Sequence, residues 1–331
     1  MNAQNSEALA PIAFFAYRRP EHTKRTLEAL AANALASESD LFIFSDGPRN
    51  EQAKEGVRAV REYIRTVKGF KSVTIREHEQ NRGLAKSLIS GITELCDRFG
   101  RVVVVEDDVL TSPYFLQFMH DGLEKYEDNE KVFSIGACWP LKPELGDNAA
   151  FFLNSFSVWG WATWKRAWDF YDYHAAGWEE LLKNKRLAWD FDLEGKADAT
   201  ALLLSQVKDN IDTWDIQWGW VIYREKKLSL FPPYSLTKNI GFDSLGEHTT
   251  SPAGEYSMRN IDLSINNAIT FPTQVELHQE KRAALGDFCY SDVKRRRGMS
   301  LRGLFWTFYR PLRRILLPVP YGITLRHNFR L

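Results

Sequence analysis

A run of four valines, Val102 to Val105, leads directly into three carboxylates, Glu106, Asp107 and Asp108. An uninterrupted β-branched run is typical of a parallel strand that helices bury on both faces. Three adjoining charges cannot lie inside such a strand, so we expect them beyond its carboxyl end, where open α/β sheets bind their ligands. Carboxylates suit Mg²⁺ or Mn²⁺, which commonly use one or two of them plus substrate phosphates. The alternative is a solvated acidic turn before a helix that begins near Ser112.

The composition predicts a globular protein of enzyme size, because 331 residues with 44% apolar content can bury one large core or two modest ones. The net charge of zero hides an asymmetry: residues 294–331 hold ten Lys or Arg and no acid, so the rest of the chain carries 33 basic against 43 acidic side chains. Three dispersed cysteines predict neither a disulfide framework nor a zinc site. We see no secretory signal and no apolar stretch of about 18 residues, so we expect a cytoplasmic protein.

Strand-like and helix-like segments alternate from Pro11 onward, which is the pattern of a parallel sheet covered by helices. The predicted strands are 11–17, 41–46, 72–78 and 101–105, and the predicted helices are 20–33, 51–65 and 82–99. Three of these strands end in polar loops, with the sequences YRRP, SDGP and EDD, and such loops meet along one edge of a doubly wound sheet. Arg18, Arg19, Asp46 and the carboxylates therefore predict a nucleotide-diphosphate site at that edge.

The SDGP loop and the segment before the helix 82–99 have simpler explanations that stay open. Asp46 could begin a DGP turn, for which Asp and Gly are ordinary residues. Asn81, Arg82 and Gly83 could be only a helix start. Gly83 forms neither a GxGxxG motif nor a Walker loop, so the sequence supports neither an NAD site nor an ATP-type P-loop.

Aromatic residues dominate the chain after Lys131, where further strands are predicted near 132–139 and 150–156. Trp161, Trp164 and Trp168 recur at helical spacing, which predicts core positions. The alternative is a platform on which sugar rings lie, since aromatic faces bind the apolar faces of pyranoses.

Asp215 lies inside a second aromatic cluster, between Trp214 and Trp218. Flanking indoles are expected to desolvate its carboxylate, which raises the pKa toward the range useful for a general base. Asp212 is the nearby competitor, and either aspartate could instead cap a helix.

The ordered motifs FAYRRP, SDGP, NRGL, VVVVEDDV, GWATW, WDIQW and NIGFDSLGEH resemble a glycosyltransferase of GT-A fold over residues 11–249. The succession is similar to the metal-dependent inverting family of the Golgi enzyme that adds the first N-acetylglucosamine branch to N-glycans. Bacterial sugar transferases of polysaccharide assembly look closer still. The resemblance implies an α/β, Rossmann-like nucleotide-binding sheet with a smaller acceptor-side region. It also implies a nucleotide-sugar donor, with UDP favoured, and a glycan or lipid-linked acceptor in bacterial surface polysaccharide assembly.

Site roles follow from the resemblance position by position. Asp108 matches the residue that binds Mn²⁺ or Mg²⁺, and Asp215 falls where the family places its catalytic base. The positions that would contact the nucleotide sugar are Tyr17, Arg18, Arg19, Asp46, Arg82, Gly83, Glu106, Asp107 and His248. Among these, Asp46 matches an aspartate that binds the uracil edge, and His248 falls in a loop that closes on the nucleotide. Arg18 departs from the polar or acidic residue of several relatives, and WDIQW matches the base motif only loosely, which keeps Asp212 possible.

The chain divides into four predicted parts: an extension at 1–10, a nucleotide-sugar-binding half at 11–130, an acceptor-binding and catalytic half at 131–292, and a basic amphipathic tail at 293–331. The tail mixes arginines with leucines and aromatic residues, so we expect it to bind an anionic membrane at the inner face of the cell membrane. Docking on the acidic body or a nucleic-acid contact are the alternatives, although no nucleic-acid partner is expected. A non-catalytic carbohydrate-binding or scaffold protein on the same fold is the competing function.

Overall fold

The structure, a computed structural model, describes residues 8–142, 148–209, 211–242, 261–265 and 268–298, with the backbone alone at 292–298. His248 and the predicted tail beyond Gly298 lie outside the described residues. No helix within the described ranges is long and apolar enough to cross a membrane.

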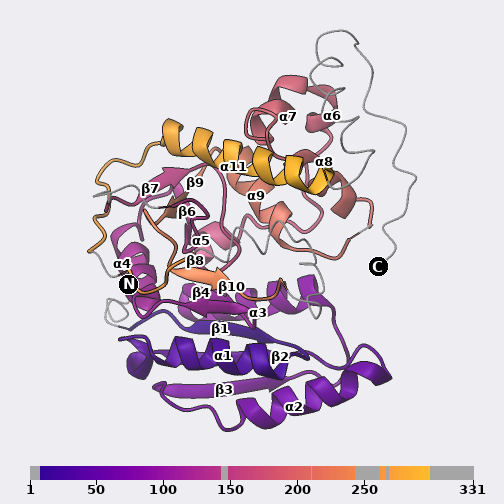
Figure 1. Ribbon diagram of the computed structural model, residues 1–331, viewed down its shortest axis with the longest axis vertical. Helices are drawn as coiled ribbons and strands as arrows, with labels where there is room; N and C mark the ends of the chain where they lie inside the picture. Colours follow the sequence, from indigo (N-terminus) through magenta and orange to yellow (C-terminus); the bar gives the residue numbers. More distant parts are fainter. Residues whose placement is uncertain (1–7, 143–147, 210, 243–260, 266–267, 299–331) are drawn as a thin grey trace.

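One eight-stranded sheet runs through the described part of the molecule (Figure 1). Its strands, in spatial order, are β3 (Ser72–Glu77), β2 (Asp40–Ser45), β1 (Ile12–Ala16), β4 (Arg101–Glu106), β8 (Trp161–Trp164), β6 (Val132–Gly136), β9 (Leu228–Phe231) and β7 (Phe151–Leu153). The first four strands of this order are mutually parallel. β8 is antiparallel to both β4 and β6, and so separates the parallel half from the rest.

Alternate residues of the central strands enter two separate cores. Val103 and Val105 pack with α1 (Pro20–Ala31), α2 (Lys54–Ile64) and α4 (Phe115–Lys125) on one face of the sheet. Val102 and Val104 pack with α3 (Leu84–Phe99), α5 (Lys165–Trp168) and α9 (Asp215–Arg224) on the other. Each valine stabilises the fold by roughly 1.5 kcal/mol or more when fully buried. The predicted α/β class, with a Rossmann-like sheet flanked by helices, is confirmed.

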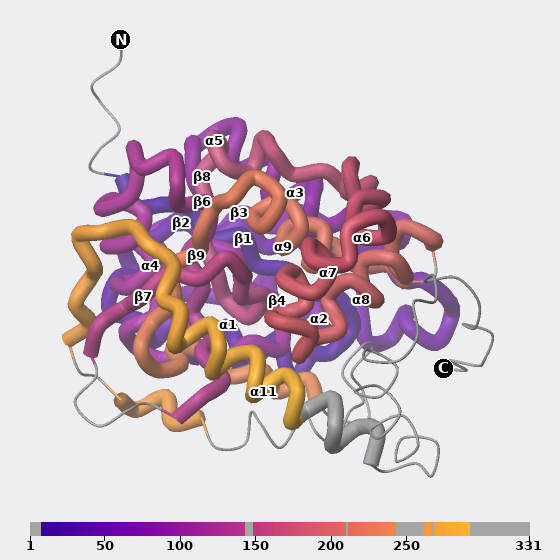
Figure 2. The backbone as a smooth tube through the Cα atoms, turned by 90° about the horizontal axis from the view of Figure 1, so that it is seen from above, coloured from indigo at the N-terminus to yellow at the C-terminus, as the bar shows by residue number. Residues whose placement is uncertain are grey.

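Six further helical segments complete the described part of the chain, and those within residues 180–206 lie close together (Figure 2). They are η1 (Ala36–Glu38), η2 (Glu51–Ala53), α6 (Glu180–Lys183), α7 (Lys185–Phe191), α8 (Ala199–Gln206) and α11 (Gln279–Gly298). α11 lies along the outside of the molecule and is held by buried Arg282. The guanidinium of Arg282 donates to Asn154 Oδ1 at 3.0 Å and to Asp190 Oδ1 at 2.9 Å.

The tryptophans occupy the core, but not on the single helix that their spacing suggests. Trp161 and Trp164 lie on strand β8, and only Trp168 belongs to the short helix α5. The three side chains are 1%, 2% and 4% exposed, so the prediction of core positions is confirmed and a sugar platform built from them is wrong. Trp214 and Trp218 are equally buried, with Trp214 stacked on Trp161.

A short two-stranded sheet follows the carboxylates, so the next helix begins further along the chain than predicted. β5 (Val109–Thr111) pairs antiparallel with β10 (Thr237–Asn239). The helix expected near Ser112 therefore begins only at Phe115. The pairing carries a distant segment of the chain to the end of β4.

Candidate active site

The three polar loops lie side by side because β1 is the strand between β2 and β4. Ala16 pairs with Ser45 on one side, and Phe15 pairs with Glu106 on the other. Residues that follow these pairs therefore leave the sheet at the same edge. Tyr17 to Arg19, Asp46 and the carboxylates are brought together by strand register alone.

Arg19 bridges two of the three carboxylates. Its Nη2 donates to Asp107 Oδ1, and to Asp108 Oδ2 at 3.0 Å. All three side chains are largely buried, with exposures of 16%, 6% and 11%. Burial by itself lowers the pKa of the guanidinium, but the two carboxylates raise it well above its usual value, so Arg19 stays charged.

Glu106 extends this anionic cluster toward Asp215. Burial raises the pKa of Glu106 well above its usual range, and the charges of Asp108, Asp107 and Asp215 raise it further. Burial likewise raises the pKa of Asp108, against the lowering effect of Arg19. No hydrogen bond reaches the Glu106 carboxyl from the side chains and backbone that the structure describes. The site thus holds four carboxyl groups against one buried arginine, which favours the binding of a further cation.

Asp108 is covered by the segment that follows β10. The backbone N–H of Ile240 donates to the carbonyl of Asp108 at 2.8 Å. A Cβ atom added to Gly241 would overlap Asp108 Oδ2 and would lie 3.0 Å from Arg19 Nη1. Glycine at this position therefore lets the chain pass directly over the carboxylate.

Asp46 is buried and its carboxylate receives four protein donors. Oδ1 accepts from the backbone N–H of Gly47 at 2.9 Å and of Arg82 at 3.0 Å. Oδ2 accepts from Asn81 Nδ2 at 3.0 Å and from the Gly83 N–H at 3.1 Å. Because a carboxylate offers about four lone-pair positions, these bonds fill its capacity. In this structure Asp46 fastens the loop that precedes α3.

Asp212 and Asp215 have different surroundings. Asp212 is exposed, and its Oδ2 accepts from the Leu84 N–H at 3.1 Å, so it caps the N-terminus of α3. Asp215 is half-buried in the first turn of α9 and uses only Oδ1, which accepts from the Thr213 hydroxyl and from the Ile216 N–H at 2.8 Å. Within the described residues no donor reaches Asp215 Oδ2.

The remaining predicted residues line the same edge. The hydroxyl of Tyr17 accepts from the Arg49 N–H at 2.9 Å, and the exposed Arg18 lies over the Tyr17 ring at 5.9 Å. Nη1 of Arg82 lies 2.9 Å from Nε2 of His78. Burial and the charge of Arg82 lower the pKa of His78.

The sequence patterns did not reveal three residues of this site. His22, buried in the first turn of α1, acts electrostatically on Asp108. Gly241 reaches the site only through long-range pairing of the chain, whereas the Thr213 hydroxyl donates to Asp215, two residues further along the chain. His22 carries a usable signal, because it follows the polar loop of the first strand by only a few residues.

No protein-family model and no curated protein match the chain. Solved structures with some similarity include TarS of S. aureus, at 13% identity and a TM-score of 0.28, over 35% of this chain and 20% of that chain. The mannosyltransferase PcManGT from Pyrobaculum calidifontis, in complex with GDP-Man and Mn²⁺, is 11% identical in sequence with a TM-score of 0.38. The match covers 67% of this chain and 70% of that chain. A putative nucleotide-diphospho-sugar transferase from Desulfovibrio desulfuricans G20 is 15% identical in sequence with a TM-score of 0.28. That match covers 49% of this chain and 66% of that chain. At this level of similarity, a function for the chain rests on its own site.

Proposed function

We propose that this chain is a metal-dependent, inverting glycosyltransferase that moves a sugar from a nucleotide-diphosphate sugar to a glycan or lipid-linked acceptor. The observation that carries the proposal is the cluster at the carboxyl edge of the sheet. There Arg19 bridges Asp107 and Asp108, while Glu106 lies within the electrostatic reach of Asp215. Buried carboxylates at this edge, beside a fixed cation, suit a ligand that combines a diphosphate with a divalent metal.

The donor set fits a hard cation. Asp107 and Asp108 converge on a single positive group, and their oxygens are the ligands that Mn²⁺ and Mg²⁺ prefer. No group of three or more His, Cys, Asp or Glu in the described part of the chain is arranged to hold a metal. We assign the metal to Asp108, the position that the resemblance implies, with donor phosphates supplying further ligands. When bound, the metal would neutralise the diphosphate as a Lewis acid.

The residues of the chain supply the other parts of the reaction. Asp215 takes the proton of the acceptor hydroxyl at Oδ2, the oxygen that receives no donor from the described residues, as that hydroxyl attacks the anomeric carbon. Arg19 remains protonated and stabilises the charge on the leaving diphosphate. Attack from the face opposite the diphosphate inverts the configuration in one displacement. Asp212 is the weaker candidate for the base because it caps α3.

Asp46 contributes to the proposed site by position. Its carboxylate is occupied by Gly47, Asn81, Arg82 and Gly83, so we assign it to shaping the loop beside the nucleotide. Direct contact with a uracil edge would require it to give up one of these donors. UDP remains our favoured nucleotide from the sequence motifs.

The competing function, a non-catalytic carbohydrate-binding or scaffold protein, loses its main support. It depended on an aromatic platform, but Trp161, Trp164, Trp168, Trp214, Trp218 and Trp220 are all buried, and of the tryptophans in these two clusters Trp159 alone is half-buried. Glu106 and Asp215 would have no evident use in such a protein.

The proposal extends to the cellular setting. A lipid-linked acceptor would bring the enzyme to the inner face of the cell membrane, where the basic tail would bind anionic lipids. Removal of the residues after Lys294 should abolish co-sedimentation with anionic vesicles. Unchanged co-sedimentation would rule out this role for the tail.

The function is tested by turnover. The purified chain is incubated with Mn²⁺, a glycan mixture and UDP-, GDP- or dTDP-sugars, and release of nucleoside diphosphate is measured. We expect one donor class to be consumed only when acceptor and metal are both present, with an inverted anomer in the product by NMR. Glycan binding without turnover of any donor would favour the carbohydrate-binding alternative.

A further inference from the structure

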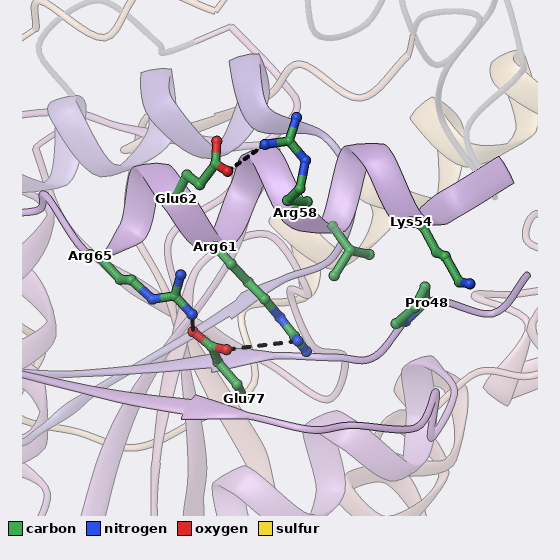
Figure 3. A pocket seen from close by; sticks show the side chains of 8 residues that line it. Pro48, Lys54, Arg58, Arg61, Glu62, Arg65 and Glu77 are labelled. Carbon is green, nitrogen blue, oxygen red and sulfur yellow. Dashed lines mark hydrogen bonds and ion pairs between the residues drawn. The ribbon is translucent and has the colours of Figure 1, made fainter. Parts of the chain in front are cut away.

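Arg61 on α2 lies outside every predicted site motif, yet its side chain reaches the strand ends next to Asp46. It lines a cavity of about 250 Å³ together with Arg65 and Glu77. Figure 3 shows both arginines directed toward Glu77, with which each forms an ion pair. The side chain of Arg65 is 57% exposed, whereas that of Arg61 is 19% exposed. Two arginines one turn apart thus share a carboxylate but differ in burial.

The largely buried side chain of Arg61 donates to main-chain carbonyls at the point where β2 and β3 separate. Its Nη2 donates to the carbonyls of His78 at 2.6 Å, Asp46 at 3.3 Å and Ser45 at 3.5 Å. Its Nε donates to Ser45 Oγ at 3.3 Å. The β2–β3 ladder ends at the pair Ser45 and Glu77, followed by one bond from the His78 N–H to the Ser45 carbonyl at 3.0 Å, so the carbonyls of Asp46 and His78 need another donor. The rigid fork of an arginine can serve several such acceptors at once.

The same main chain carries the loop of the candidate site. The carboxylate of Asp46 accepts hydrogen bonds from Asn81, Arg82 and Gly83. The loop also packs closely at Gly47, where an added Cβ would lie 2.5 Å from the carbonyl carbon of Gln80. Arg61 holds both ends of this arrangement, since it binds the carbonyl of Asp46 on one strand and that of His78 on the other.

We infer that Arg61 is a positioning residue for the 78–83 loop, and through it for Arg82 and the N-terminus of α3. Without Arg61, the end of β2 and the end of β3 lose their common donor, and the loop samples open conformations. The consequence for the nucleotide rests on the proposed function, because it assumes that Arg82 and Gly83 lie beside a bound donor. The consequence for loop order does not.

Hydrogen exchange of the full chain without ligand tests the inference, with Arg61→Met compared with Arg65→Met. Arg65 is the matched control because it is on the same helix and pairs with the same Glu77. We expect amides of residues 78–84 to exchange about tenfold faster in Arg61→Met, and at the wild-type rate in Arg65→Met. Equal exchange in the two variants would overturn the inference. If Arg61→Met does not fold, Arg61→Lys and Arg65→Lys replace the pair, because lysine keeps the charge but lacks the fork.

A second measurement separates positioning from general destabilisation. For an identified donor, Arg61→Met should raise KM about tenfold and leave kcat within about twofold, because the loop is ordered again once the donor is bound. A fall in kcat with KM unchanged would contradict positioning of the donor loop. If wild type binds no nucleotide, the proposed function fails while the exchange result still decides the role of Arg61.

Discussion

Nη2 of Arg19 lies 3.0 Å from Oδ2 of Asp108, so a buried ion pair joins the end of β1 to the end of β4. The same nitrogen also binds Asp107, and the guanidinium occupies the place where two carboxylates converge. Because these side chains are largely buried, water cannot replace Arg19 as the partner of either carboxylate, and loss of the arginine would destabilise the fold. A positive charge at this point is therefore a requirement of the fold as well as of the proposed chemistry.

Arg19→Gln should destabilise the chain and make its stability depend on metal. Removing one partner of a buried pair costs about 3 to 5 kcal/mol, so the free energy of unfolding in EDTA should fall by about that amount. Mn²⁺ should restore more stability to the variant than to wild type, because it neutralises the same carboxylates. Denaturant titrations with EDTA and with Mn²⁺ measure both effects. Arg58→Gln, which removes two exposed ion pairs on α2, to Glu55 and Glu62, is the control and should change little. Equal stability of the two variants would refute the role of Arg19.

Asp215→Asn should lower turnover by about two to four orders of magnitude, the usual effect of losing a general base, with donor affinity little changed. Asp212→Asn is the matched control, since asparagine also caps helices well and should preserve the α3 N-terminus. Single-turnover rates and nucleotide titrations separate the two effects. A large loss of turnover in Asp212→Asn, with near-normal turnover in Asp215→Asn, would identify Asp212 as the general base instead of Asp215.

Gly241→Ala should weaken metal-dependent nucleotide binding by about tenfold or more. The added Cβ would overlap Asp108 Oδ2, so either the carboxylate or the 239–241 segment must move. Calorimetric titration of the nucleotide in Mn²⁺ measures the change. Wild-type affinity in this variant would mean that Asp108 is not part of the nucleotide site.

The first half of the fold could be predicted from the sequence because its signals are local. The strand that ends at Glu106 is a β-branched run, and its helices carry clear apolar periodicity. The sequence predicted only that the polar loops share one edge of the sheet, and the register of β1 with β2 and β4 confirms this.

In the second half of the chain, the spacing of the tryptophans led to a wrong prediction of secondary structure, because the same spacing occurs in a helix and in a strand followed by a helix. Trp161 and Trp164 would share one face of a helix, but on strand β8 they point to opposite faces and join different cores. Arg61 and Gly241 could not be found from the sequence, because their partners lie on other strands and loops. Such partnerships are set by tertiary pairing and leave no local pattern.

His120 makes the fold sensitive to acid. Burial, with a contribution from Arg101, lowers the pKa of His120 to about 4. The folded state therefore favours the neutral imidazole of His120. Above pH 6.5, the usual pKa of histidine, the imidazole is neutral in both folded and unfolded chains and the fold keeps its full stability. As the pH falls toward 4, only the unfolded chain gains the proton, so the free energy of unfolding decreases. The free energy of unfolding should drop by about 3 kcal/mol more in wild type than in His120→Leu across this range. Denaturant titrations at several pH values measure this difference, and parallel pH profiles would contradict it.

The central claim is that a nucleotide diphosphate and a divalent metal bind together at Asp108. The most direct test is calorimetric titration of UDP, and then GDP and dTDP, into wild type and Asp108→Asn, each with Mn²⁺ and with EDTA. We predict that one nucleotide binds wild type in Mn²⁺, that EDTA weakens this binding by about tenfold or more, and that Asp108→Asn loses the metal dependence. Binding that is equal in wild type and Asp108→Asn, or no binding of any nucleotide in Mn²⁺, would contradict the claim.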